Sequence, residues 1–188
     1  MFARIAIAAF FAALLALIPG PARADGVELA TLATRKAEDG LELSFTTRFE
    51  LSRTAVDALH KDVALYFIAE AVVLRNRWYW RDARVSSVER TWRLKWDSLT
   101  RQYRVSTGGL QQSFATLDEA LTMLRGQSAW RIAEPKDIED GGSYYLEFSY
   151  KLDVNQLPRL MQIGGMQSGF ALSVEQKRGL NSDFSLKQ

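Results

Sequence analysis

A stretch of ten residues near the start of the chain alternates between two kinds of side chain. Leu41, Leu43, Phe45, Thr47 and Phe49 alternate with the polar residues Glu42, Ser44, Thr46, Arg48 and Glu50. Because successive side chains of a β-strand point to opposite faces, this period of two predicts a strand with one buried face. Val27 to Thr34 is predicted to be the partner strand of a hairpin, joined to it through a turn in the polar segment 35–40. The chain is therefore expected to build sheets.

The remaining periodic segments continue this pattern and add two helices. Further strands are expected at 64–77, 85–96, 101–106, 130–133, 144–153 and 170–177. Capping boxes at Thr54–Asp57 and Thr116–Glu119 predict short helices ending near Lys61 and Arg125. The loop 154–169, with Pro158 and two adjacent glycines, has room for one helical turn. This order predicts a mainly β (β-rich α+β) fold, an antiparallel sandwich or open barrel with two short peripheral helices.

The first 24 residues have the layout of a secretory signal peptide. Arg4 precedes an apolar run from Ile5 to Ile18, and Ala22-Arg23-Ala24 forms a small-residue cleavage signature. The run is shorter than the roughly 20 residues that span a bilayer as a helix. We therefore expect cleavage near Ala24/Asp25, a periplasmic location, and a mature chain of one soluble β-rich domain, residues 25–188, without a membrane span.

Composition narrows the chemistry that this domain can perform. The chain has no Cys and one His, which removes disulfides, thiol chemistry and most zinc sites. Its formal charge is +2, and because Arg4 and Arg23 lie in the predicted signal peptide, the mature chain is neutral. Neutrality and export both argue against a nucleic-acid partner.

Positive charge is nevertheless concentrated in the segment from Arg75 to Arg104. This segment contains nine basic and three acidic residues. With a hairpin loop at 97–100, Arg93, Lys95 and Arg104 share one face of a β-ribbon, and Arg93 lies opposite Arg104. Like charges opposite each other are unfavourable unless a carboxylate or an anionic ligand lies nearby. The face is either solvated and neutralised by acidic residues, or it binds a partner or an anion.

The segment Arg77-Trp78-Tyr79-Trp80-Arg81-Asp82 stands just before this ribbon. Trp78 and Trp80 share one strand face, which indicates a structural corner where the rings pack inward and an Arg stacks on an aromatic ring. An exposed aromatic platform for a sugar or lipid is the alternative. We expect Arg77, Trp78, Trp80 and Asp82 to form this corner beside the ribbon, with Asp82 paired to a neighbouring Arg.

Four separated motifs together resemble a known family: Arg77–Asp82, Leu99–Val105, Phe114–Leu121, and Leu152-Asp153 followed by Leu157–Arg159. In order and spacing they are similar to a family of Gram-negative envelope proteins classed as a domain of unknown function. The resemblance implies an exported protein, often encoded next to a membrane sensor histidine kinase of the nitrogen-regulation type. It therefore implies such a kinase, or another envelope protein, as a partner, and it carries over no catalytic residue.

These observations favour binding over catalysis. His60 is expected near the end of a short helix, where a capping role accounts for it, and the paired carboxylates lie in turns or at a helix start. We therefore expect a non-catalytic periplasmic binding or accessory protein, with no cofactor and no metal. The alternative is a carrier or sensor of a small anionic or lipidic ligand held between the sheets.

Overall fold

The computed structural model describes residues 26–77, 81–139, 141–162 and 168–187. The predicted signal peptide, 1–24, lies outside them, as do Trp78 and Trp80. The elements in chain order are β1 (Glu28–Ala37), β2 (Gly40–Arg48), α2 (Arg53–His60), β3 (Leu65–Arg75), β4 (Ala83–Asp97), β5 (Gln102–Thr107), β6 (Leu110–Phe114), α3 (Leu117–Leu124), β7 (Gly126–Ala133), η2 (Pro135–Asp137), β8 (Tyr144–Leu152), η3 (Val154–Gln156), α4 (Arg159–Gln162) and β9 (Ser173–Gly179).

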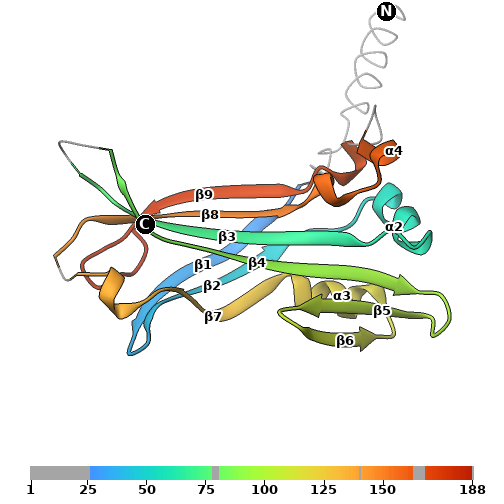
Figure 1. Ribbon diagram of the computed structural model, residues 1–188, viewed down its shortest axis with the longest axis horizontal. Helices are drawn as coiled ribbons and strands as arrows, with labels where there is room; N and C mark the ends of the chain where they lie inside the picture. The colour runs from blue at the N-terminus through green and yellow to red at the C-terminus, as the bar shows by residue number, and fades with distance from the viewer. Residues whose placement is uncertain (1–25, 78–80, 140, 163–167, 188) are drawn as a thin grey trace, which may run out of the picture.

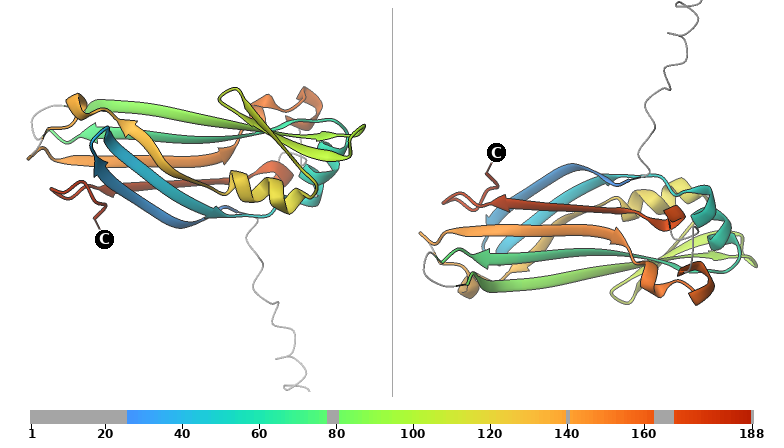
Figure 2. Two further views of the ribbon diagram at one scale, coloured as in Figure 1. Left: turned by 90° about the horizontal axis from the view of Figure 1, so that it is seen from below. Right: turned by 90° about the horizontal axis from the view of Figure 1, so that it is seen from above.

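The strands form two antiparallel sheets that face each other (Figures 1 and 2). The small sheet has the order β1-β2-β7, and the large sheet has the order β6-β5-β4-β3-β8-β9. The small sheet covers one part of the large one, and α3 covers the same face near β5 and β6 (Figure 2). Of the two predicted alternatives, the structure is the sandwich. No described helix has both the length and the apolar character needed to cross a membrane.

Aromatic side chains fill the space between the sheets. Phe45 of β2 lies between Trp92, Phe148 and Tyr150 of the large sheet, with ring centroids 6.4, 4.9 and 5.9 Å away. Each of the four side chains is no more than 2% exposed. Because a ring of this kind buries roughly 150–250 Å², the cluster is a major source of stability in a chain without disulfides.

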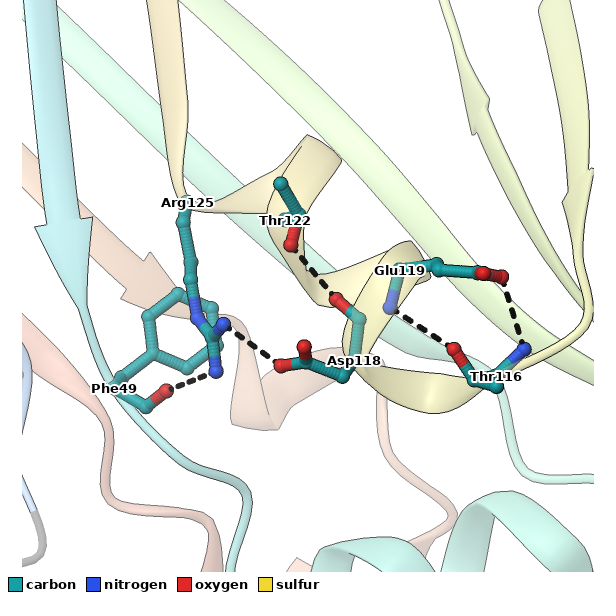
Figure 3. Close-up of polar contacts among 6 residues, drawn as sticks. All are labelled: Phe49, Thr116, Asp118, Glu119, Thr122 and Arg125. Carbon is teal, nitrogen blue, oxygen red and sulfur yellow. Dashed lines mark hydrogen bonds and ion pairs between the residues drawn. The ribbon is translucent and has the colours of Figure 1, made fainter.

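The second predicted helix is present with its predicted cap (Figure 3). The Thr116 hydroxyl accepts a hydrogen bond from the Glu119 N–H, and the Glu119 carboxylate accepts one from the Thr116 N–H. The Arg125 guanidinium, just after α3, donates to the Asp118 carboxylate and to the Phe49 carbonyl, both at 3.0 Å. These bonds fix α3 against the end of β2.

The cap of the first helix differs from the prediction. Its N-cap is Ser52, whose hydroxyl accepts from the Ala55 N–H at 3.1 Å, so the capping box predicted at Thr54–Asp57 is wrong. Ser52 can cap because it already has the extended backbone that a cap requires. The single turn predicted within 154–169 is α4, and the strand β6 is an element that the sequence patterns did not reveal.

Candidate functional site

The β4–β5 hairpin turns one residue later than predicted. Asp97 remains in β4 opposite Gln102, and the loop is 98–101 rather than 97–100. Arg101 closes this loop with a left-handed backbone, φ 52°, which a sequence argument does not expect of Arg. The β5 residue opposite each β4 residue is therefore two positions later than predicted. Because side chains alternate between the two faces of a strand, a shift of two leaves the predicted faces unchanged. The predicted Arg93–Arg104 pair is wrong: Lys95 lies opposite Arg104.

We call Arg93, Lys95 and Arg104 the basic ribbon. They lie on the face of the large sheet that points away from the small sheet, because alternate residues such as Leu94 and Val105 are buried. Arg93 is exposed, and Lys95 and Arg104 are half-buried. Within the part of the chain that the structure describes, no carboxylate forms an ion pair with Arg93 or Lys95. The ribbon thus keeps a like-charge pair on an accessible surface.

Asp97 is the carboxylate that this surface does contain. It forms an ion pair with Arg104 at 2.5 Å, and its other oxygen accepts from the Leu99 and Thr100 N–H groups, both at 3.0 Å. The bond from Thr100 chiefly, with the charge of Arg104 as a further cause, lowers the pKa of Asp97 below its usual 3.8. One acidic residue therefore shapes the loop and balances one of three cations.

Donor groups of the ribbon remain open to a partner. The Arg93 guanidinium lies 6.0 Å from the ring centroid of Tyr66, its strand partner on β3, at the outer limit of a cation–π contact. The arginine is thus held over the sheet by an aromatic ring that takes none of its N–H donors.

Other basic residues of the segment 75–104 have separate roles. Arg75 pairs with Glu139 at 3.0 Å. Arg90 points between the sheets, where it donates to the Gln127 side chain at 3.0 Å and lies 5.7 Å from the Trp130 ring centroid. The positive charge of the segment is therefore spread over several places, and the hairpin end forms the basic ribbon.

A small aromatic cluster supports the ribbon from the opposite face. The ring centroids of Trp96 and Tyr103 are 4.6 Å apart, and His60 Nε2 lies 2.8 Å from the Tyr103 hydroxyl. Burial raises the pKa of Tyr103, so its hydroxyl keeps its proton and is a poor nucleophile. His60 was predicted near the end of this helix, and it is the last residue of α2. Its contact with Tyr103 joins the helix to β5.

Asp82, the residue just before β4, lies away from the ribbon. Asp82 accepts from the Tyr145 hydroxyl at 2.7 Å and from the Arg77 N–H at 3.2 Å, and these bonds lower its pKa. The predicted pairing of Asp82 with an arginine side chain is thus replaced by a tyrosine and a backbone amide. Because β4 rises about 3.3 Å per residue, Asp82 and the ribbon stand roughly 40 Å apart at opposite ends of that strand.

The outer face of the large sheet also holds a hollow that sequence reasoning missed. Its volume is about 580 Å³, and its lining includes Glu70, Val72, Arg84, Glu147, Glu175 and Lys177. Glu70 lies directly opposite Glu89 on β4, and Ser149 stands between Glu70 and Glu175 across β8. Only the sheet order, which joins residues over 100 positions apart, reveals this acidic row of Glu89, Glu70 and Glu175.

The ribbon offers guanidinium and ammonium donors suited to carboxylates or phosphates. In the described residues, no group of three or more His, Cys, Asp or Glu side chains is placed to hold a metal ion.

Comparison with known proteins identifies a family. Residues 24–178 match the model of a family described as a domain of unknown function (DUF4390). No curated protein and no solved structure matches the chain. The matched range extends from before β1 into β9, so it covers both sheets and the ribbon.

Proposed function

The chain belongs to the DUF4390 family, and from its geometry we propose that it is a non-catalytic binding protein whose basic ribbon recognises an acidic partner in the bacterial periplasm. The observation that carries this proposal is that Asp97 balances Arg104, whereas Arg93 and Lys95 lie on the same accessible sheet face with no carboxylate paired to either among the described residues. Like charges directly opposite each other on a sheet are destabilising. A carboxylate-rich partner would turn that cost into attraction.

The compartment and the class of partner are parts of the same proposal. The layout of residues 1–24 supports export and a mature chain that begins near Asp25. The family resemblance of the four sequence motifs supports a membrane sensor histidine kinase, or another envelope protein, as the partner. A non-catalytic role agrees with the contacts of His60, the only histidine of the chain, which bonds to a protonated tyrosine rather than to a Ser–Asp pair.

Charge reversal on one strand tests the proposal. The ribbon variant Arg93→Glu/Lys95→Glu and the control Arg81→Glu/Arg84→Glu change the net charge equally, the first toward the end of β4 and the second at and just before its start. Each protein is used to capture partners from envelope extract, and the bound proteins are compared by quantitative mass spectrometry. We expect the ribbon variant to lose partners that the wild type and the control retain. Identical partner sets for all three proteins would refute the proposal.

A carrier of a small anionic amphiphile is the second candidate, because one groove fits that chemistry. It lies between β1 and β9 at an open side of the sandwich, with a volume of about 410 Å³. Leu29, Leu32 and Leu186 supply apolar surface, and Arg178 and Lys187 supply positive charge. Native mass spectrometry separates the candidates: a reproducible bound lipid that disappears in Arg178→Glu favours the carrier, and a ligand-free mass from different expression hosts refutes it.

A further inference from the structure

The strand β6, next to the basic ribbon, is an unprotected sheet edge. It is the last strand of the large sheet beside β5, and Leu110 to Ser113 are all exposed. Its sequence LQQSF contains no charged residue and no proline, and its pairing with β5 has no bulge. Natural proteins usually protect such edges with charges, prolines or bulges, because an open edge accepts another strand.

The other sheet edges of the described chain do carry such protection. β1 contains Glu28, Arg35 and Lys36 and a register shift, and β7 contains Arg131 and two register shifts. β9 contains three charged residues, and the C-terminal segment covers part of it through the bond from Lys187 N–H to the Gly179 carbonyl. Protection is therefore missing at the edge that adjoins the ribbon.

Hairpin geometry shows which backbone groups of β6 are open. Gly108 and Gly109, both with positive φ, form a two-residue turn, so Thr107 and Leu110 are the hydrogen-bonded pair that flanks it. Because bonded and non-bonded positions alternate, the N–H and C=O groups of Gln111 and Ser113 point outward. The next outward amide, that of Ala115, is already bonded to the Glu119 carboxylate at 3.1 Å. The open edge is thus short and ends where α3 begins.

We infer that β6 binds an extended acidic segment of a protein partner as an added strand; this inference rests on the proposed function and specifies how the partner docks. On the ribbon face, Ser113 lies opposite Arg104, and Gln111 lies opposite Ser106. An added strand would lie about 4.8 Å beyond β6. Arg104 is bonded to Asp97 on the β4 side, and Arg93 and Lys95 lie three strand spacings, about 14 Å, from an added strand. The ribbon therefore attracts acidic side chains on that strand through its electric field, while the backbone of β6 supplies the direct contacts.

Charge also selects this occupant over a second copy of the chain. Pairing of β6 with β6 of another molecule would bring two basic ribbons to the same face, where they repel each other. An acidic strand instead places carboxylates next to the ribbon, and its backbone satisfies the groups of Gln111 and Ser113.

Proline substitution tests the edge without breaking the hairpin. In Ser113→Pro the lost N–H points outward, so the bonds between β5 and β6 remain, whereas an added strand loses a donor and meets the proline ring. Ser113→Ala is the matched control, because it removes the hydroxyl and keeps the N–H. Gln111→Pro serves as a second edge variant, and thermal unfolding verifies that each variant folds.

The probe is a capped peptide that alternates Glu with Thr and Val, and binding is followed by amide NMR and hydrogen exchange. We expect the Gln111 and Ser113 amides to become protected, Ser113→Pro to weaken binding about tenfold, and Ser113→Ala to change it less than about twofold.

One result overturns the edge inference and leaves the proposed function standing. In that result Arg93→Glu/Lys95→Glu abolishes binding, both proline variants bind as the wild type does, and the amides of residues 111 and 113 gain no protection. Absence of binding to the wild type overturns both, and a dimer that the proline variants dissociate assigns the edge to a second copy instead.

Discussion

Asp97 shows how one side chain combines loop formation with charge balance. Its carboxylate accepts two backbone N–H groups of the loop and pairs with Arg104, and its pKa is lowered. A group whose pKa is lower in the folded state stabilises the fold above its unfolded pKa. That contribution is lost as the pH falls through the folded value. For Asp97 the loss begins near 3.8 and is complete below the lowered pKa.

The substitution Asp97→Asn separates the charge from the loop bonds. An amide oxygen can still accept from Leu99 and Thr100, but it cannot pair with Arg104 as an ion. We therefore expect the variant to be less stable than the wild type at pH 7, and the difference in melting temperature to disappear as the pH falls below 3.8. Thermal unfolding between pH 2.5 and 7 measures this. A difference that stays constant across that range would show that the charge of Asp97 contributes nothing.

At the scale of single elements, the N-cap of α3 allows a quantitative prediction of stability. Thr116 and Thr122 both lie at α3, but only Thr116 accepts a bond from a free helix N–H, whereas the Thr122 hydroxyl donates to the Asp118 carbonyl within the helix (Figure 3). Loss of an N-cap costs about 1 kcal/mol. We expect Thr116→Ala to lower the free energy of unfolding by about 1 kcal/mol and Thr122→Ala to change it by less than about 0.5 kcal/mol.

Urea denaturation measures the free energy of unfolding of the two variants. If the free energy falls with urea concentration at the same slope in both, their stabilities can be compared directly. Equal losses for Thr116→Ala and Thr122→Ala would contradict a capping role for Thr116.

The elements that the sequence revealed are those with a strong local pattern. The alternation of Leu41–Phe49 and the capping box at Thr116–Glu119 depend on neighbours in sequence, and both are present in the structure. β6 has five residues, and only Leu110 and Phe114 on one of its faces are apolar, so its sequence gives no clear alternation that would predict a strand. The pair Gly108-Gly109 was the available indication, because adjacent glycines favour a two-residue hairpin turn.

The candidate site was predictable in its residues but not in its pairing. Which side chains of β4 and β5 share a face follows from alternation alone, and Arg93, Lys95 and Arg104 do share one. The partner of each depends on the loop, and the left-handed backbone of Arg101 has no sequence signature. The acidic row could not be predicted from the sequence, because its residues become neighbours only through the order of β4, β3, β8 and β9 in the sheet.

At the scale of the whole molecule, opposite charges gather in different regions of one sheet face. The acidic row of Glu89, Glu70 and Glu175 crosses the middle of the large sheet, and the basic ribbon lies toward the β4–β5 turn. Glu89 and Arg93 are four residues apart on β4, which is about 13 Å. The chain as a whole is nearly neutral, so this separation, rather than net charge, would orient an acidic partner.

This charge separation predicts how association depends on salt. The Debye length falls from about 30 Å at 0.01 M salt to about 8 Å at 0.15 M, so an approaching acidic strand meets both regions in dilute salt and only the ribbon at physiological salt. We expect Glu70→Gln/Glu89→Gln to raise the association rate roughly threefold at 0.01 M and to have no effect at 0.15 M. Arg93→Glu/Lys95→Glu should lower it under both conditions.

Stopped-flow measurements with the alternating Glu peptide give these rates. Glu38→Gln/Asp39→Asn is the control, because the β1–β2 turn lies at the far end of the molecule from the β4–β5 turn (Figure 1). It removes the same charge as the acidic-row variant and should change the rate far less. If the two variants accelerate association equally, net charge sets the rate. If only the acidic-row variant does so, repulsion from the middle of the sheet directs an acidic strand toward the ribbon and the adjoining edge of β6.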